Sequence, residues 1–227
     1  MNTHDKTENA SVPFNEILEG LARQHPDAKP ELDFRSPYEL LIATILSAQC
    51  TDKQVNKVTP ALFAEYPTPA DMAKAEPDEI EPYIHSCGFY HNKAKNIVLA
   101  CREIAERFGG EVPGDRESLE SLAGVGRKTA NVVLSNAFGI PAIAVDTHVF
   151  RVSNRLGLAT AKTVEETERQ LMRNIPEEKW SIAHHWLIFH GRRVCSAQRP
   201  KCGECMVREL CREYSSRKDG ETDELRR

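Results

Sequence analysis

The stretch LAGVGRKTA at residues 122–130 places a glycine turn directly before an apolar-periodic helix predicted from Lys128 to Phe138. A phosphate-binding P-loop needs glycine immediately before the lysine, and Arg127 holds that position, so this motif is excluded. The stretch instead predicts a tight turn, Gly124–Gly126, whose backbone N–H groups can face an anion at a helix N-terminus. If the turn needs a backbone geometry at Gly126 that alanine resists, Gly126→Ala should weaken binding to all DNA substrates alike. A nucleic-acid phosphate suits this site, although an ordinary helical joint with a surface lysine explains the same residues.

Apolar residues recur every three or four positions along most of the chain, which predicts an all-α fold. The predicted helices cover about 38–46, 94–108, 128–138, 149–156 and 180–189. Helix boundaries are marked by candidate N-caps at Asp115, Asp146 and Thr163, and by terminating glycines at 109–110 and 157. Residues 142–145 fit either a short strand or an extended linker. The polar ends, 1–13 and 214–227, are predicted to be flexible.

Composition indicates an ordinary globular protein of 227 residues, 40% of them hydrophobic. The longest apolar runs, such as residues 40–46, fall far short of the roughly 20 residues that span a bilayer. The N-terminus is polar and lacks an apolar signal core. We therefore expect a soluble, cytoplasmic protein with no membrane partner.

Charge is distributed unevenly, although the net value is only −4. Residues 65–83 carry six acids and one lysine, whereas residues 192–218 carry eight Lys or Arg and three Glu. Such segregation favours a face that binds a polyanion. A solvated basic tail without a partner remains the alternative.

Four of the seven cysteines crowd into a short segment with the spacing C-x6-C-x2-C-x5-C, at Cys195, Cys202, Cys205 and Cys211. Nothing in the sequence suggests export, so a disulfide framework is not expected. The density of cysteines therefore indicates a metal site. Zinc sites usually have two short pairs, so the single central pair favours a [4Fe–4S] cluster, with zinc still open. The other three, Cys50, Cys87 and Cys101, are interpreted as small buried hydrophobes.

Three motifs in this order, LAGVGRKTA, AVDTHVFRVSNRLGL and the four-cysteine pattern, resemble the endonuclease III family of DNA glycosylases with abasic-site lyase activity. The resemblance extends over about residues 14–213. It implies a helix–hairpin–helix at about 116–135 in a six-helix domain at 30–140. It also implies a second helical domain, made of 14–29 and 141–213, that carries the [4Fe–4S] cluster. A DNA cleft would lie between them. A bacterial, nucleoid-associated monomer that repairs oxidised pyrimidines and abasic sites in double-stranded DNA is expected.

The same resemblance implies roles for individual residues. Lys128 and Asp146 would be catalytic. Gln49 would enter the space left by a flipped nucleotide, and Phe89 would wedge the duplex. The hairpin residues Gly124, Val125, Gly126 and Arg127 would contact DNA. The chain departs from the family pattern at Ala123, Cys50 and Phe89, where proline, alanine and leucine are common.

A lysine nucleophile suits the expected chemistry, because its attack at C1′ leaves an imine that permits β-elimination at the 3′ phosphate. Such a lysine must lose its proton, which burial, Arg127 or the helix N-terminus would favour. Asp146 would either accept that proton or stabilise positive charge on the sugar; helix capping alone is its structural alternative. A non-enzymatic DNA-binding module and an iron–sulfur electron carrier are the competing functions, and neither requires Lys128 as a nucleophile.

Overall fold

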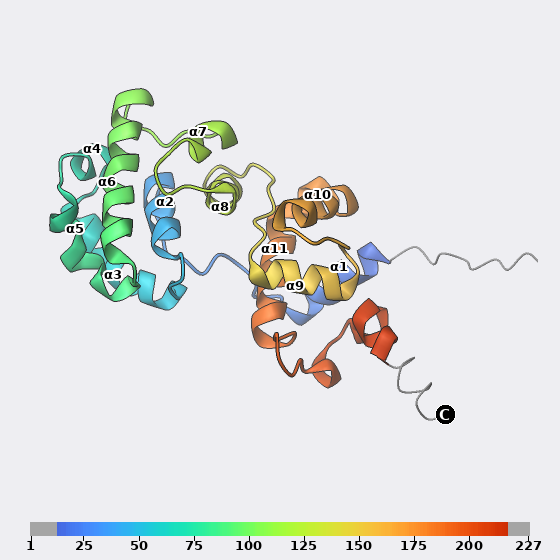
Figure 1. The fold of residues 1–227 in the computed structure, drawn as a ribbon. Helices are drawn as coiled ribbons and strands as arrows, with labels where there is room; N and C mark the ends of the chain where they lie inside the picture. The colour runs from blue at the N-terminus through green and yellow to red at the C-terminus, as the bar shows by residue number, and fades with distance from the viewer. Residues whose placement is uncertain (1–12, 218–227) are drawn as a thin grey trace, which may run out of the picture. The chain divides into compact units, whose positions relative to one another are not determined.

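The computed structural model describes residues 13–217. The described residues form helices and no strand, which confirms the all-α prediction. The expected flexible segments lie mostly outside them, and residues 212–217 at the C-terminal side are helical. The labelled α-helices are α1 (Phe14–Gln24), α2 (Pro37–Leu46), α3 (Asp52–Glu65), α4 (Pro69–Met72), α5 (Pro77–Ile84), α6 (Tyr90–Arg107), α7 (Arg116–Glu120), α8 (Arg127–Ala137), α9 (Thr147–Leu156), α10 (Val164–Asn174) and α11 (Trp180–Arg193) (Figure 1).

The chain divides into two compact units. The larger runs from Lys29 to Asp146 and includes Glu177–His185; the smaller takes the described residues up to Ala28, Thr147–Pro176 and those from Trp186 onward. Helix α11 therefore contributes its first half to the larger unit and its second half to the smaller. The domain boundaries predicted at residues 29/30 and 140/141 stay a prediction.

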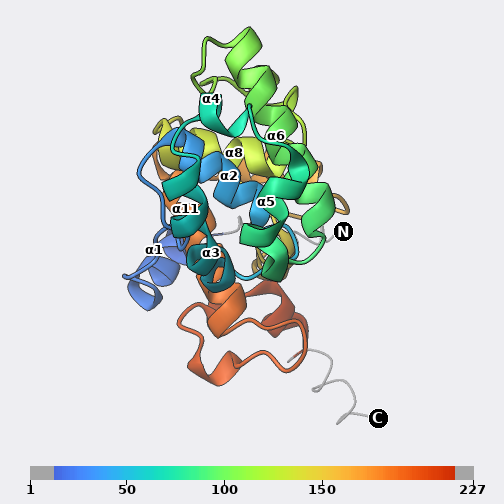
Figure 2. The ribbon, with the colours of Figure 1, turned by 90° about the vertical axis from the view of Figure 1, so that its left-hand side faces the viewer.

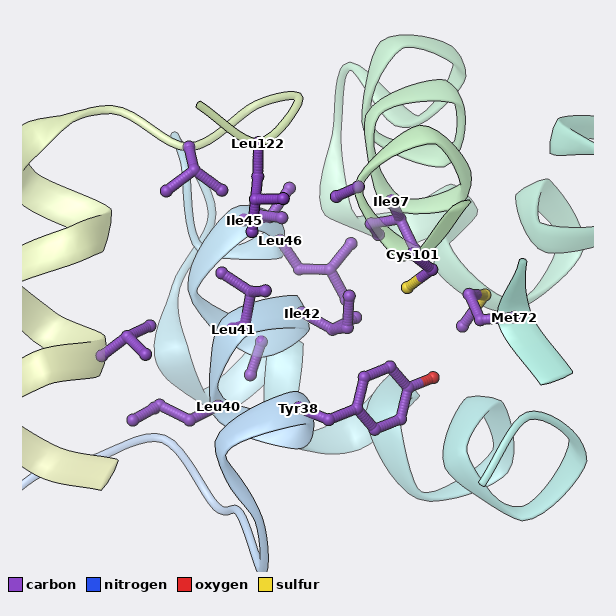
Figure 3. Close-up of a cluster of buried hydrophobic side chains, with 14 of the residues drawn as sticks. Tyr38, Leu40, Leu41, Ile42, Ile45, Leu46, Met72, Ile97, Cys101 and Leu122 are labelled. Carbon is purple, nitrogen blue, oxygen red and sulfur yellow. The ribbon is translucent and has the colours of Figure 1, made fainter. Parts of the chain in front are cut away.

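Helix α2 is the centre of the larger unit, in contact with α3, α6 and α8 (Figure 2). Its sequence, PYELLIATIL, is apolar on all sides, which is the pattern of a fully buried helix. Ser36 caps it by accepting a hydrogen bond from the Glu39 backbone N–H, and Pro37 occupies the first turn. Side chains from α2, α4, α6 and the hairpin meet in one core (Figure 3).

The predicted capping signals are largely observed. Asp115 Oδ1 accepts from the Ser118 N–H at 2.9 Å before α7, and Thr163 Oγ1 accepts from the Glu166 N–H at 3.2 Å before α10. Helix α6 ends just before Gly109 and Gly110, both at positive φ. Residues 142–145 form no strand and are an extended linker.

In the smaller unit, the cysteine segment packs against α1. Gln24 Nε2 donates to the Glu204 carbonyl at 2.7 Å, and the Met206 N–H donates to Gln24 Oε1 at 3.1 Å. A Cβ on Gly20 would lie 2.3 Å from Val207 Cγ1, so this helix position must be glycine for the segment to approach. Among the described residues, none of the helices is long and apolar enough to cross a membrane.

Candidate functional site

The sequence LAGVGRKTA forms the turn of a helix–hairpin–helix, because α7 ends at Glu120 and α8 begins at Arg127. Leu122 and Val125 are buried and anchor the turn in the core of the larger unit. The Ala123 N–H donates to Glu103 Oε2 at 2.9 Å, which ties the turn to α6 where the family pattern has a proline. The predicted motif is confirmed.

The two glycines of this turn have different structural requirements. Gly124 has φ +74°, and a Cβ there would meet Asn96 Cβ at 2.8 Å, so both backbone conformation and space demand glycine. Gly126 caps α8 with φ −99° and ψ 177°, a conformation open to any residue. A Cβ on Gly126 would meet nothing within 4 Å. The turn therefore does not need a backbone geometry at Gly126 that alanine resists.

Lys128 is the second residue of α8, and both Lys128 and Arg127 are exposed. The amine thus stands in the first turn of a helix, whose N-terminus carries partial positive charge. Lys128 also lies close enough to the buried His184 to contribute to that residue's electrostatics: burial, then His185 and Lys128, lower the pKa of His184 well below its usual value.

Asp146 directly precedes α9, at the N-cap position expected from the sequence, and is half-buried. It ends the linker that follows α8. Asn131, fully buried on α8 three residues beyond Lys128, donates from Nδ2 to the Ile143 carbonyl at 2.9 Å. This hydrogen bond joins the helix of Lys128 to the linker that leads to Asp146. Both predicted catalytic residues belong to the larger unit.

Two buried histidines of α11 lie beside these elements within the larger unit. The rings of His184 and His185 are in contact, with centroids 3.9 Å apart and planes tilted by 39°, and His185 Nε2 donates to Asn136 Oδ1 of α8 at 3.1 Å. Burial lowers the pKa of His185 to about 4, so it is neutral at physiological pH. The sequence does not predict this pair, because a histidine in an apolar-periodic helix has no local signal that distinguishes it from a surface residue.

Gln49 and Phe89 share an unusual backbone conformation. Gln49 lies in the turn between α2 and α3 with φ 53°, and Phe89 lies directly before α6 with φ 49°. Of the described residues other than glycine, only one more, Arg199, has positive φ. Gln49 is exposed, and 66% of Phe89 is exposed, an unusual environment for a phenylalanine. Left-handed non-glycine residues cost about 1–3 kcal/mol each and cluster at functional sites.

The four clustered cysteines are brought together in the smaller unit, where they line one small cavity of about 30 Å³ with Leu156, His190 and Val194. Polar groups surround the sulfur atoms. Arg155 donates from Nη1 to Cys195 Sγ at 3.4 Å. His190 Nε2 lies 3.6 Å from Cys205 Sγ, and its Nδ1 lies 3.1 Å from Nε2 of the buried His25. Within residues 13–217, no three His, Cys, Asp or Glu side chains converge closely enough to hold a single metal ion.

These features, a helix–hairpin–helix followed by a lysine and an aspartate that precedes a helix, lie in one continuous region of the chain. A family model for HhH-GPD superfamily base excision DNA repair proteins matches residues 42–177. The chain belongs to this superfamily. The matched residues include all of the predicted catalytic and DNA-binding residues. The match ends before the cysteine segment.

Within the HhH-GPD superfamily, the similarity to endonuclease III is extensive. The endonuclease III of Haemophilus influenzae is 51% identical over 202 residues, which cover 89% of this chain and 95% of the relative. That of Escherichia coli K12 is 50% identical over 204 residues, 90% of this chain and 96% of the relative. A solved structure of a trapped endonuclease III–DNA covalent intermediate is 53% identical, with a TM-score of 0.85, and covers 90% of this chain and 96% of that chain. The endonuclease III resemblance is confirmed.

Proposed function

We propose that this chain is a base-excision DNA glycosylase and abasic-site lyase that removes oxidised pyrimidines, with Lys128 as its nucleophile. The observation that carries the proposal is the position of Lys128. It is exposed in the first turn of α8, directly after the hairpin. Membership of the HhH-GPD superfamily supports the activity, and the capture of a similar endonuclease III in covalent linkage to DNA supports a nucleophilic mechanism. The enzyme would act as a monomer, in the cytoplasm, on nucleoid DNA.

The reaction follows from the chemistry of an amine. Neutral Nζ of Lys128 attacks C1′ of the damaged nucleotide, the glycosidic bond breaks, and the base leaves with a proton. The Nζ lone pair then expels O4′, which takes up a proton as the sugar ring opens, and a protonated imine that keeps the second Nζ proton forms between lysine and C1′. The imine withdraws electrons, so a proton leaves C2′ and the C3′–O3′ bond breaks with departure of the 3′ phosphate. Water then hydrolyses the imine and frees the lysine.

Asp146 would assist the first of these steps. Its carboxylate can accept the proton that Lys128 must lose, or it can stabilise positive charge on the sugar as the base departs. The Asn131 hydrogen bond to Ile143 supports this assignment, because it fixes the linker before Asp146 against the helix of Lys128. Preorganised groups of this kind avoid reorganisation during the reaction.

Gln49 and Phe89 would hold open the gap left by the extruded nucleotide. Extrusion costs a few kcal/mol, least for bases that stack badly, such as oxidised pyrimidines that are no longer planar. Phe89 would fill space between base steps, as apolar wedges do in other DNA complexes, and Gln49 would hydrogen-bond the unpaired partner base. Their exposure and left-handed backbone support these roles.

The hairpin residues Gly124, Val125, Gly126 and Arg127 would bind a phosphate. Val125 is buried, so its backbone rather than its side chain would contribute. The open space beside Gly126 allows a phosphate to approach its backbone. Arg127 is exposed and would add a charged contact.

We assign Cys195, Cys202, Cys205 and Cys211 to a [4Fe–4S] cluster. The four side chains line one pocket, and no three of them among the described residues converge on a single point, which favours a cluster that takes one thiolate at each iron over zinc, whose ligands all surround one ion. Burial raises the pKa of the Cys205 thiol to about 11. When present, the cluster would cross-link the segment that packs on α1.

Borohydride trapping on a duplex with one abasic site tests the proposal. Reduction of the imine would leave a permanent bond between Lys128 and the sugar, seen as a shifted band on a denaturing gel. We expect Lys128→Gln to abolish trapping and strand cleavage while affinity for the same duplex stays within about tenfold. Arg127→Gln is the matched control, which should bind more weakly and still be trapped. Trapping of Lys128→Gln at the normal rate would refute the assignment.

A further inference from the structure

Lys93, on α6, is a buried lysine with no role in the chemistry above. It is 5% exposed. Its ammonium donates to the Leu46 carbonyl at 2.8 Å and to the Cys87 carbonyl at 2.7 Å. Within the described part of the chain it forms no ion pair. A buried ammonium without a carboxylate is costly unless hydrogen bonds compensate it, so the two carbonyl groups are essential partners.

These two carbonyl groups belong to the two segments that present the predicted wedge residues. Leu46 is the last residue of α2, three positions before Gln49. Cys87 ends a short 3-10 turn, two positions before Phe89. The Lys93 backbone N–H also donates to the Phe89 carbonyl at 3.1 Å. The two carbonyl groups lie 47 and 6 residues from Lys93 in the sequence, so Lys93 links two separate loops.

The surroundings of Lys93 are otherwise apolar enough to disfavour charge. Burial lowers the pKa of Lys93, while the neighbouring thiol groups of Cys50 and Cys87 act in the opposite direction. An uncharged side chain such as methionine would fill this space at less desolvation cost. Donation to two carbonyl groups at once is what methionine cannot supply.

We infer that Lys93 is a positioning residue for nucleotide extrusion, whose ammonium holds the Gln49 loop and the Phe89 loop in the fixed relation that lets both side chains enter one gap in the duplex. The inference rests on the proposed roles of Gln49 and Phe89. Without the ammonium, both carbonyl groups lose a buried donor, and each loop relaxes separately. Misplacement of about 1 Å is enough to lower a rate by a factor of about 100.

The test measures two single-turnover rates on Lys93→Met: base excision from a duplex with an oxidised pyrimidine, and strand cleavage at a preformed abasic site. Excision requires extrusion of a stacked base, whereas an abasic site has no base to unstack. We expect excision to fall about tenfold or more relative to abasic-site cleavage. Arg102→Met is the matched control, because Arg102 lies on the same helix and donates to the carbonyl groups of Ala73 and Ala75. It should leave the ratio of the two rates unchanged.

A double-mutant cycle separates positioning from general destabilisation. If Lys93 acts through the wedge, Lys93→Met should change the ratio of rates little in a Phe89→Ala background. An unchanged ratio in Lys93→Met, or an equal fall in both backgrounds, would overturn the inference. Should Lys93→Met not fold, Lys93→Gln, which keeps amide donors, is measured by the same criteria. Normal excision by both Gln49→Ala and Phe89→Ala would instead refute the proposed wedge roles, whatever Lys93 does.

Discussion

Asn131 Nδ2 donates to the Ile143 carbonyl at 2.9 Å, and this buried hydrogen bond connects the helix that carries Lys128 to the linker that carries Asp146. Both ends are inaccessible to solvent, since Asn131 and Ile143 are each 0% exposed. A buried carbonyl that loses its donor costs about 1–3 kcal/mol. The position of Asp146 relative to the proposed nucleophile therefore depends in part on a buried residue that is not exposed to solvent.

Replacing Asn131 should affect catalysis as well as stability. We expect Asn131→Leu to lower the free energy of unfolding by about 1–3 kcal/mol, because the Ile143 carbonyl loses its donor. It should also lower the single-turnover rate of base excision more than affinity for an abasic duplex. Ser135→Ala is the control: Ser135 is buried one turn later on α8, and its Oγ has no hydrogen-bond partner among the described residues. If both variants lose excision equally, the hydrogen bond is not what positions the site.

The two glycines of the hairpin should respond oppositely to alanine. Gly124→Ala places a Cβ against Asn96 at positive φ, so we expect a loss of about 1–3 kcal/mol in denaturant unfolding. Gly126→Ala should unfold within about 0.5 kcal/mol of the parent. It should nevertheless bind undamaged and damaged duplexes more weakly by a similar factor, because the added methyl would occupy the space proposed for a phosphate. Unchanged DNA affinity in Gly126→Ala would show that no phosphate binds at that position.

Acid should destabilise the larger unit through its buried histidines. An unfolded histidine has a pKa of about 6.5, whereas burial lowers the pKa of His185 to about 4. Between these values the unfolded chain binds a proton that the folded chain does not. The contribution of His185 to the free energy of unfolding is therefore unaffected by pH above about 6.5 and becomes increasingly unfavourable as pH drops toward 4. Chemical denaturation at several pH values measures the slope. His185→Asn, which removes the titrating group, should show a shallower slope. A parallel slope would mean that other groups control acid unfolding.

Iron content should depend on the four clustered cysteines and on none of the other three. We expect the purified protein to be brown, and Cys202→Ser to lose both colour and iron. Because a bound metal group stabilises the folded state, Tm should fall by about 5 °C or more. Cys50→Ala is the control and should keep its iron, since Cys50 lies in the larger unit. A colourless protein with stoichiometric zinc would contradict the cluster assignment.

Local signals were sufficient for much of the fold. Asp115 and Thr163 predict the starts of two helices, because a capping side chain and its N–H partner lie three residues apart in sequence. The start of α6 shows the limit. Apolar spacing predicts the start of this helix near Ala94, but the helix begins at Tyr90. The residue before it, Phe89, is left-handed and makes no side-chain capping hydrogen bond, so the sequence contains no signal for the true start.

The site was less predictable wherever its geometry depends on distant contacts. Gly124 and Gly126 look equivalent in sequence, and only the approach of Asn96 and the sign of φ distinguish them. Lys93 reads as a surface lysine near the start of a helix. The role inferred for Lys93 depends on Leu46, which is 47 residues away in sequence. The Leu46 carbonyl lies at the end of α2, within hydrogen-bond distance of the Lys93 ammonium.

The left-handed conformations of Gln49 and Phe89 bear on how the protein searches a genome. Glycine at either position would relieve the backbone strain, so the native residues hold a conformation that costs folding free energy. In return, the two residues proposed to probe the duplex already hold this backbone conformation before DNA binds. A repair enzyme inspects very many intact base pairs for each lesion, and a probe that needs no loop rearrangement spends little time on each of them. The cost is incurred once, when the chain folds, and not again at every step along the DNA.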